Sequence, residues 1–198
     1  MAKQIALFPL DLVLFPGEEI ELHIFEERYK KLFSEILEGK CEAGIIRKPN
    51  EHVSNVMGTL FSVVRIINTY KSGELDVLIR GEAVFTLNSF EEGSEDTIYP
   101  VGAIEIFDTD VFDKVPPGLL TLANEALRAV SGNANRPWTS LILTSELLQV
   151  LQLPIEVRER FLQSIRNKQW KSFLKGQLQL FISVQQQMRQ LKGNYQLN

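Results

Sequence analysis

The sequence predicts an α+β protein, in which a small barrel or rolled β-sheet with one inserted helix precedes a region of helices. Two observations predict this class. Roughly six short runs, rich in β-branched residues, lie before residue 108, with one helical pattern among them. From Pro116 onward, apolar residues recur instead at the spacing of amphipathic helices. We therefore expect two domains, at residues 1–112 and 113–198.

Two Phe-Pro steps mark the start of the predicted sheet. Phe8-Pro9 and Phe15-Pro16 are seven residues apart, and each proline lacks the N–H that a central strand needs. We expect short edge strands joined by a bend at Pro16-Gly17. The period then changes to that of a helix, which should end at Gly39. Its apolar face should consist of Phe25, Tyr29, Leu32, Phe33, Ile36 and Leu37.

The remaining strands follow this helix. Residues 42–47 form a short apolar run, and residues 58–70 form a long run rich in valine and isoleucine. The turn Lys71-Ser72-Gly73 predicts a hairpin, whose returning strand should occupy residues 74–81. We expect a separate strand at residues 82–90, after Gly81, and a last one at residues 99–107. This spacing predicts a sheet that curls up and so protects its edges.

The helical region should contain an amphipathic helix over residues 116–130 and a central buried helix over residues 139–153, which is apolar almost all round. A further helix should start at Pro154, and a last one should run over residues 168–191. At 1.5 Å per residue that last helix is about 36 Å long. Its apolar stripe can fold back within the chain or, where it protrudes, pair with a second copy or another protein.

Charge is distributed unevenly along the chain. Residues 157–198 carry eight basic residues and one acidic residue, a net charge of +7. The preceding residues carry the other 13 Lys and Arg against 24 Asp and Glu, a net charge of −11, and the two parts sum to −4. The basic helices therefore either lie along the acidic remainder or contact an acidic partner.

Three stretches resemble one family. They are FPLDLVLFPGEEIELHIFEERY at residues 8–29, MGTLFSVVRIINTYKSGELDVLIRGEAVFTL at residues 57–87, and LQLPIEVRERFLQ at residues 151–163. The pattern is similar to the amino-terminal substrate-binding (LON) domain of Lon proteases, particularly the small bacterial proteins that carry this domain alone. The resemblance implies a PUA-like β pseudobarrel for residues 5–108, followed by a carboxy-terminal helical bundle. Many relatives place a basic residue where this chain has Ala83-Val84.

The resemblance also assigns structural roles. Arg28 should pair with a carboxylate beside the barrel, with Tyr29 packed beneath it. The motif positions are Pro9, Pro16, Gly17, Glu26, Arg28, Tyr29, Gly58 and Gly81.

By analogy with the family, the chain should be a non-enzymatic module that binds unfolded or exposed apolar polypeptide segments. Its partners would include a protease or chaperone, and a homodimer through the last helix is a further expectation. The candidate peptide-binding residues lie near the Phe-Pro bend and on the neighbouring strand, and each has ordinary barrel core as its alternative interpretation. They are Leu12, Val13, Phe15, Met57 and Phe61.

Catalysis is not expected. The sequence has no G-x-x-x-x-G-K-[ST] phosphate loop, and a Ser-Lys peptidase domain would not fit beside the LON domain in 198 residues. Neither His23 nor His52 has a second ligand at metal-binding spacing, and the single Cys41 excludes an internal disulfide. We therefore expect no cofactor and no metal, and a buried thiol at Cys41.

The alternative function is that of a nucleic-acid-binding PUA-like protein that uses the basic carboxy-terminal helices. The net negative charge of the barrel opposes this function, because it repels the phosphate groups of a nucleic acid. No apolar run reaches the roughly 18 residues of a membrane span, and the start of the chain is unlike a signal peptide. We expect a cytoplasmic protein with no membrane segment.

Overall fold

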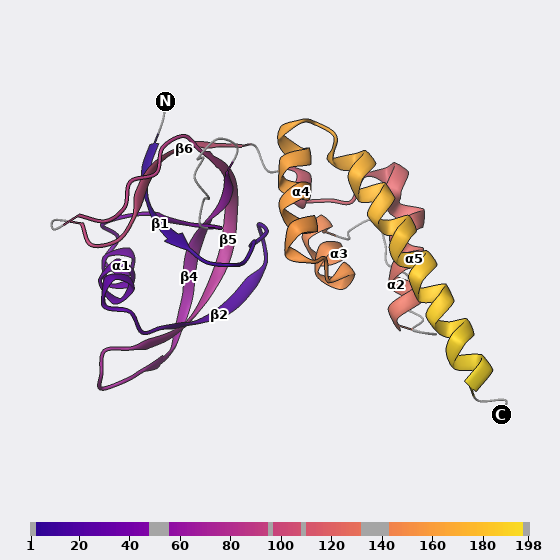
Figure 1. Ribbon diagram of the computed structural model, residues 1–198, viewed down its shortest axis with the longest axis horizontal. Helices are drawn as coiled ribbons and strands as arrows, with labels where there is room; N and C mark the ends of the chain where they lie inside the picture. Colours follow the sequence, from indigo (N-terminus) through magenta and orange to yellow (C-terminus); the bar gives the residue numbers. More distant parts are fainter. Residues whose placement is uncertain (1–2, 48–55, 95–96, 108–109, 132–142, 196–198) are drawn as a thin grey trace. The chain divides into compact units, whose positions relative to one another are not determined.

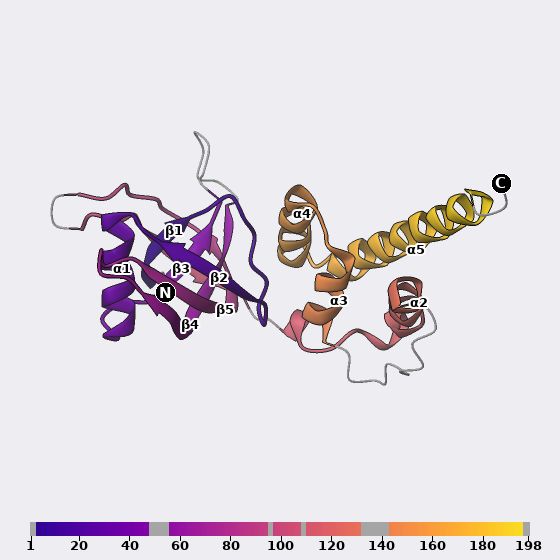
Figure 2. The same cartoon turned by 90° about the horizontal axis from the view of Figure 1, so that it is seen from below.

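The computed structural model describes residues 3–47, 56–94, 97–107, 110–131 and 143–195 (Figures 1 and 2). Contacts between residues divide the chain into two compact units, residues 1–109 and 110–198. The first is called the β unit here and the second the helical unit.

The β unit contains strands that form one sheet and a helix inserted after the second strand, as the sequence predicts. The strands are β1 (Lys3–Pro9), β2 (Glu19–Ile24), β3 (Ala43–Ile46), β4 (Met57–Thr69), β5 (Leu75–Leu87) and β6 (Val101–Ile106), and the helix is α1 (Glu27–Leu37). Within the described residues the strand order is β2-β5-β4-β3-β1-β6, and an additional pairing of β5 with β6 nearly closes the sheet into a ring. The predicted rolled sheet is therefore confirmed.

β5 exchanges one neighbour for another along its length. One of its edges pairs with β4 throughout, whereas the other pairs with β2 over residues 75–80 and with β6 over residues 85–87. The ring thus consists of β1, β3, β6 and the ends of β4 and β5 nearest Met57 and Leu87. The other halves of β4 and β5 extend beyond the ring with β2 beside them (Figure 1). We call this part the three-stranded extension.

Three sequence predictions for the β unit are wrong. β1 is not an edge strand, because it pairs with β3 on one side and with β6 on the other. Residues 74–81 and 82–90 do not form separate strands, because Gly81 lies inside the continuous strand β5. In the sequence a glycine suggests the end of a strand, but Gly81 instead leaves room for the backbone of Phe15. The helix begins at Glu27 rather than Phe25, whose side chain is 59% exposed, so Phe25 does not belong to the buried face. Leu37 at the other end of the helix is also exposed.

The Phe-Pro bend is docked against the middle of β5. Gly17 N–H donates to the carbonyl of Gly81 at 2.8 Å, and Gly81 N–H donates to the carbonyl of Glu18 at 2.9 Å. The buried carboxylate of Glu18 accepts a hydrogen bond from Phe15 N–H at 2.9 Å. Gly17 has a φ of 82°, which glycine adopts without strain. The bend is therefore held by hydrogen bonds on both sides of Pro16.

A single apolar cluster joins α1 to the sheet. Tyr29, Leu32 and Phe33 on the buried face of α1 pack with Phe8 of β1 and Phe61 of β4. The ring of Phe8 lies 4.5 Å from that of Tyr29 and 5.6 Å from that of Phe33, measured between centroids. These aromatic contacts fix α1 against the face of the sheet that carries Phe8 and Phe61.

Arg28 forms an ion pair within its own motif. Its guanidinium contacts the carboxylate of Glu26 at 2.8 Å, within the same motif, and lies 4.6 Å above the Tyr29 ring. The predicted burial of Tyr29 is confirmed.

The helical unit contains two short 3₁₀ turns and four α-helices within the described residues. They are η1 (Asp110–Phe112), η2 (Pro117–Leu119), α2 (Leu120–Ser131), α3 (Thr144–Leu151), α4 (Ile155–Arg166) and α5 (Trp170–Tyr195). The predicted buried helix at residues 139–153 is shorter than expected, since α3 begins at Thr144, and Leu141 and Ile142 lie outside the described residues. Its leucines Leu147, Leu148 and Leu151 are buried as predicted. None of the described helices combines the length and apolar character that a bilayer crossing requires.

The last helix α5 packs mainly against α2 and α4. Leu174, Leu178 and Ile182 are buried, whereas Met188 and Leu191 are exposed. Further along, the guanidinium of Arg189 donates to the carbonyls of Arg128 and Ala129 at the end of α2, at 3.2 and 2.7 Å. A cation is favourable at a helix carboxyl end, because its carbonyl groups carry partial negative charge. The helix thus folds back onto α2, and its distal apolar stripe stays exposed.

The close approach at Gly81 generates a stability prediction. A Cβ at this position would lie 2.4 Å from the carbonyl oxygen of Phe15, a backbone atom that cannot rotate away. Gly81→Ala should therefore lower the free energy of unfolding by about 1–3 kcal/mol, measured by urea denaturation with circular dichroism. Gly176→Ala is the matched control, because that Cβ would meet no atom within 4 Å, and in a helix it should add about 0.5–1 kcal/mol. Unchanged stability of the Gly81 variant would contradict the docked bend.

Candidate functional site

The structure places the five predicted peptide-binding residues in two different environments. Phe15 and Phe61 are buried in the core, so neither forms an open surface. Leu12, Val13 and Met57 are half-buried. The hydroxyl of Thr59 on β4 donates to the carbonyl of Leu14 at 2.6 Å, which brings the bend segment beside this strand. The prediction therefore selected two segments that are neighbours in the fold. Two of the five predicted side chains, those of Phe15 and Phe61, nevertheless belong to the core.

A cleft of about 420 Å³ opens next to Phe61. One wall is the last turn of α1, the second is the chain that leads into β3, and the third is β4. The lining includes Ile36, Leu37, Ala43, Phe61, Ser62 and Val63. The cleft lies at the point where β3 and β4 separate, because Ala43 and Phe61 are the last pair that the two strands form. We call it the α1–β4 cleft.

Apolar side chains remain exposed on both sides of this cleft. On the α1 side, Leu37 is 46% exposed. On the β4 side, Val64 and Ile66, which follow Val63 along the strand, are each 44% exposed. Exposed apolar residues that lie singly on a surface need no explanation, but a group around a cleft is typical of a binding surface. Sequence reasoning missed these three residues as site candidates.

A second hollow, of about 780 Å³, shares Cys41 with the α1–β4 cleft and includes Lys40, Thr97 and Tyr99 in its lining. Burial, together with a hydrogen bond to Glu35, raises the pKa of the Tyr99 hydroxyl. Burial and the nearby Glu35 also raise the pKa of the Cys41 thiol, which keeps it protonated and a poor nucleophile. Neither group is tuned for catalysis. Among the described residues, no group of three or more His, Cys, Asp or Glu side chains could hold a metal ion.

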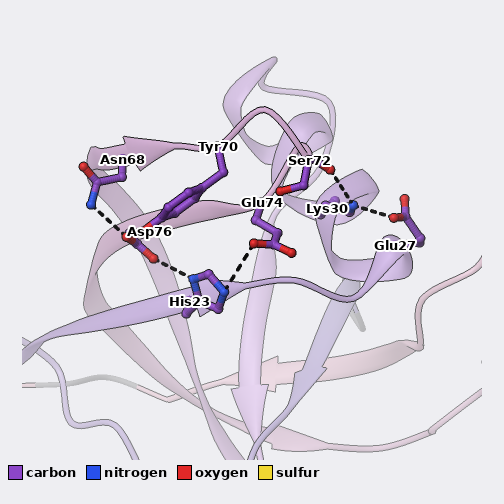
Figure 3. Close-up of polar contacts among 8 residues, drawn as sticks. All are labelled: His23, Glu27, Lys30, Asn68, Tyr70, Ser72, Glu74 and Asp76. Carbon is purple, nitrogen blue, oxygen red and sulfur yellow. Dashed lines mark hydrogen bonds and ion pairs between the residues drawn. The ribbon is translucent and has the colours of Figure 1, made fainter.

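Polar contacts fix the tip of the β4–β5 hairpin (Figure 3). Asp76 of β5 accepts hydrogen bonds from Asn68 at 2.8 Å and from the hydroxyl of Tyr70 at 2.7 Å, and its other oxygen lies 2.7 Å from Nδ1 of His23 on β2. On the other side of the hairpin, Lys30 of α1 donates to the carbonyl of Ser72 at 3.1 Å. The hairpin is therefore tied to β2 through Asp76 and to α1 through Lys30.

These hydrogen bonds explain the acidity of Asp76. Donation from Asn68, Tyr70 and His23 stabilises the ionised carboxylate, which lowers the pKa of Asp76 from 3.8 to about 2. The carboxylate in turn raises the pKa of the Tyr70 hydroxyl. Asn68, Tyr70 and His23 all contact the one carboxylate of Asp76, and these contacts join the hairpin to β2. We therefore interpret the cluster as a structural clamp on the hairpin tip.

Comparison with known proteins decides the family. Residues 4–196 match the model of the ATP-dependent protease La (LON) substrate-binding domain. The chain belongs to this family. The LON domain takes up almost all of the 198 residues, which leaves no room within them for an ATPase or a peptidase domain.

Two solved structures share the fold. A Lon N-terminal domain protein from Xanthomonas campestris is 22% identical, with a TM-score of 0.61, over 81% of this chain and 90% of that one. The N-terminal domain of the Lon protease from Mycobacterium avium complex is 12% identical, with a TM-score of 0.52, over 93% of this chain and 98% of that one. The search of curated proteins found no match. The similarity thus extends through both units of the LON domain.

Acid should loosen the hairpin tip of this LON domain. A carboxylate whose folded pKa is depressed contributes stability that is fully present above its unfolded pKa and is lost as pH falls through the folded value. For Asp76, this interval runs from about pH 4 down to about pH 2. Over it, NMR signals of residues 68–76 should shift together, and Asp76→Asn should abolish that shift. Glu21→Gln, on the same face of the sheet, should leave it unchanged, and an identical titration in the Asp76 variant would contradict the clamp.

Proposed function

We propose that this LON domain is a non-enzymatic module that binds extended polypeptide segments through exposed apolar side chains. The observation that carries the proposal is the α1–β4 cleft, with buried Phe61 in its lining and exposed Leu37, Val64 and Ile66 around it. Folded proteins bury their own apolar side chains, so a site of this chemistry selects segments that are unfolded or not yet folded. The family description, a substrate-binding domain, supports the same role.

The geometry favours a ligand made of polypeptide over a small molecule. The cleft is continuous with a long strand rather than enclosed, since its lining passes from the end of α1 to Ser62 and Val63 and the exposed apolar residues continue along β4. An extended chain can follow such a surface and bury several side chains in turn. Partners of this LON domain would then be the proteins that display such segments, together with a protease or chaperone that acts on them.

Binding to an unfolded protein tests the proposal. Fluorescence anisotropy with a labelled, permanently unfolded, carboxymethylated protein should give a micromolar Kd, about −8 kcal/mol, because ordering a flexible segment offsets part of the interaction. The same protein in its folded form is the control and should not bind.

Salt separates this mode from attachment through the basic helices. Burial of apolar surface persists at high salt, whereas contacts between charged groups are screened. Affinity for the unfolded protein should therefore change little between low and high salt. No binding at either salt, or binding that disappears as salt rises, would contradict the proposal.

A further inference from the structure

We infer that the bound segment adds a strand to the sheet, by pairing with the outer edge of β4 from Ser62 to Thr69. This inference rests on the proposed function and specifies how the polypeptide is held. β3 pairs with β4 only as far as Phe61, whereas β4 continues for eight more residues. Over this stretch β4 pairs with β5 on one side, and within the described part of the chain no strand pairs with the other side. Unpaired backbone N–H and C=O groups form a template for an extended chain.

The extension has a second open edge, on β2, but its side chains are of the wrong kind. Within the described residues β2 pairs with β5 alone, and Glu19, Glu21 and His23 are exposed along it. Charged residues on an edge strand discourage pairing with another chain. The corresponding stretch of β4 carries one exposed charged residue, Arg65, between two exposed apolar residues, Val64 and Ile66. Of the two edges, that of β4 suits an apolar segment.

The α1–β4 cleft gives this edge its side-chain site. Where β3 diverges, a strand added to β4 would take up the position that β3 leaves, with α1 beside it. Side chains of a strand point alternately to the two faces of a sheet. Every second side chain of the added strand would therefore enter the cleft and contact Ile36, Leu37 and Val63, while the others would remain in solvent.

The edge is already held in place before any segment arrives. Lys30 ties the hairpin turn to α1, and His23 and Asp76 tie it to β2 (Figure 3). A binding surface that is fixed in advance loses less conformational entropy on association. Most of the conformational entropy lost on binding is therefore that of the segment, which is consistent with a micromolar Kd.

Irregularities in β4 limit how firmly a segment can pair. The register of β4 against β5 shifts between Val63 and Arg65 and again between Ile66 and Asn68, so that Val64 and Ile67 have no partner in β5. Such bulges twist an edge and oppose long, regular pairing, including pairing between two copies. The ligand class is therefore an extended segment of about six to eight residues, without proline and with apolar side chains at alternate positions.

Backbone methylation of the ligand tests this inference. Three labelled peptides share one sequence of alternating valine and threonine: one is unmodified, and two carry N-methyl groups on alternate residues, in opposite phases. Alternate N–H groups of a strand point to opposite edges, so one phase blocks the edge that faces β4 and the other blocks the edge that faces solvent. One methylated peptide should bind at least about tenfold more weakly than the other, a difference of about 1.4 kcal/mol. Equal affinity of all three peptides, or equal loss in both phases, would overturn the inference.

Protein variants locate the site independently. Ile66→Lys should weaken binding of the unmodified peptide at least about tenfold, because it places a charge where an apolar side chain should be buried. Val130→Lys is the matched control, because it also replaces an exposed β-branched apolar side chain by lysine, but in the helical unit, where Val130 of α2 is 54% exposed. This variant should bind the peptide as tightly as the unmodified protein does. Saturating peptide should also slow amide hydrogen exchange in residues 62–69. Equal binding by the two variants, or unchanged exchange, would overturn the inference.

The outcomes separate the two proposals. If the unfolded protein binds but the peptides do not, or bind without dependence on methylation phase, strand addition is wrong and the proposed function stands. If neither the unfolded protein nor any peptide binds, the proposed function fails as well.

Discussion

Phe15 places its carbonyl group against Gly81, in the middle of β5, and only a residue without a side chain leaves room for this contact. Gly81 also lies where β5 exchanges β2 for β6 as its neighbour. The Phe-Pro bend fills the space between these two neighbours, since the hydrogen bonds of Gly17 and Glu18 continue the pairing of β2 up to Gly81. The bend therefore decides where the ring ends and where the three-stranded extension begins.

The open edge of β4 follows from the same division. β4 and β5 each have 13 residues, whereas β3 has four, so only the part of β4 within the ring can be paired on both sides. α1 covers the face of the extension that carries Val77 and Ile79, through Tyr29 and Phe33. Its last turn leaves Val63 half-buried and Ile66 exposed. Closing the barrel at one end thus exposes an apolar edge at the other. The proposed binding site is a consequence of strand length as much as of side-chain type.

Much of this fold could be predicted from residues with strong local preferences. Pro16 and Gly17 indicate a bend wherever they occur, the turn at Gly73 defines the hairpin, and the helical spacing of Tyr29, Leu32 and Phe33 identifies the face of α1 that is buried. Predictions were wrong where the outcome depended on distant contacts. Gly81 reads locally as a chain break because nothing nearby in the sequence shows that Phe15 will approach it.

The candidate site was harder to predict for a related reason. An apolar residue on a strand has the same local signature whether it faces the core, as Phe15 and Phe61 do, or lies open, as Ile66 does. Which of these applies depends on whether another strand pairs alongside. One signal was available: the predicted strand at residues 42–47 is much shorter than the one at residues 58–70, and any neighbour that short must leave part of the longer strand uncovered.

The pairing of β1 with β6 has a consequence for synthesis on the ribosome. β1 begins at Lys3, but its antiparallel partner β6 ends at Ile106. At about 5–20 residues per second, β1 waits roughly 5–20 s for this partner to be made. The β4–β5 hairpin, joined by a short turn, can form within microseconds of emerging. For those seconds the edge of β1 that later pairs with β6, at residues 3–6, stays open even where β3 already pairs with the other edge. A protein that we propose to bind unfolded segments therefore itself exposes an unpaired strand edge while it is being made.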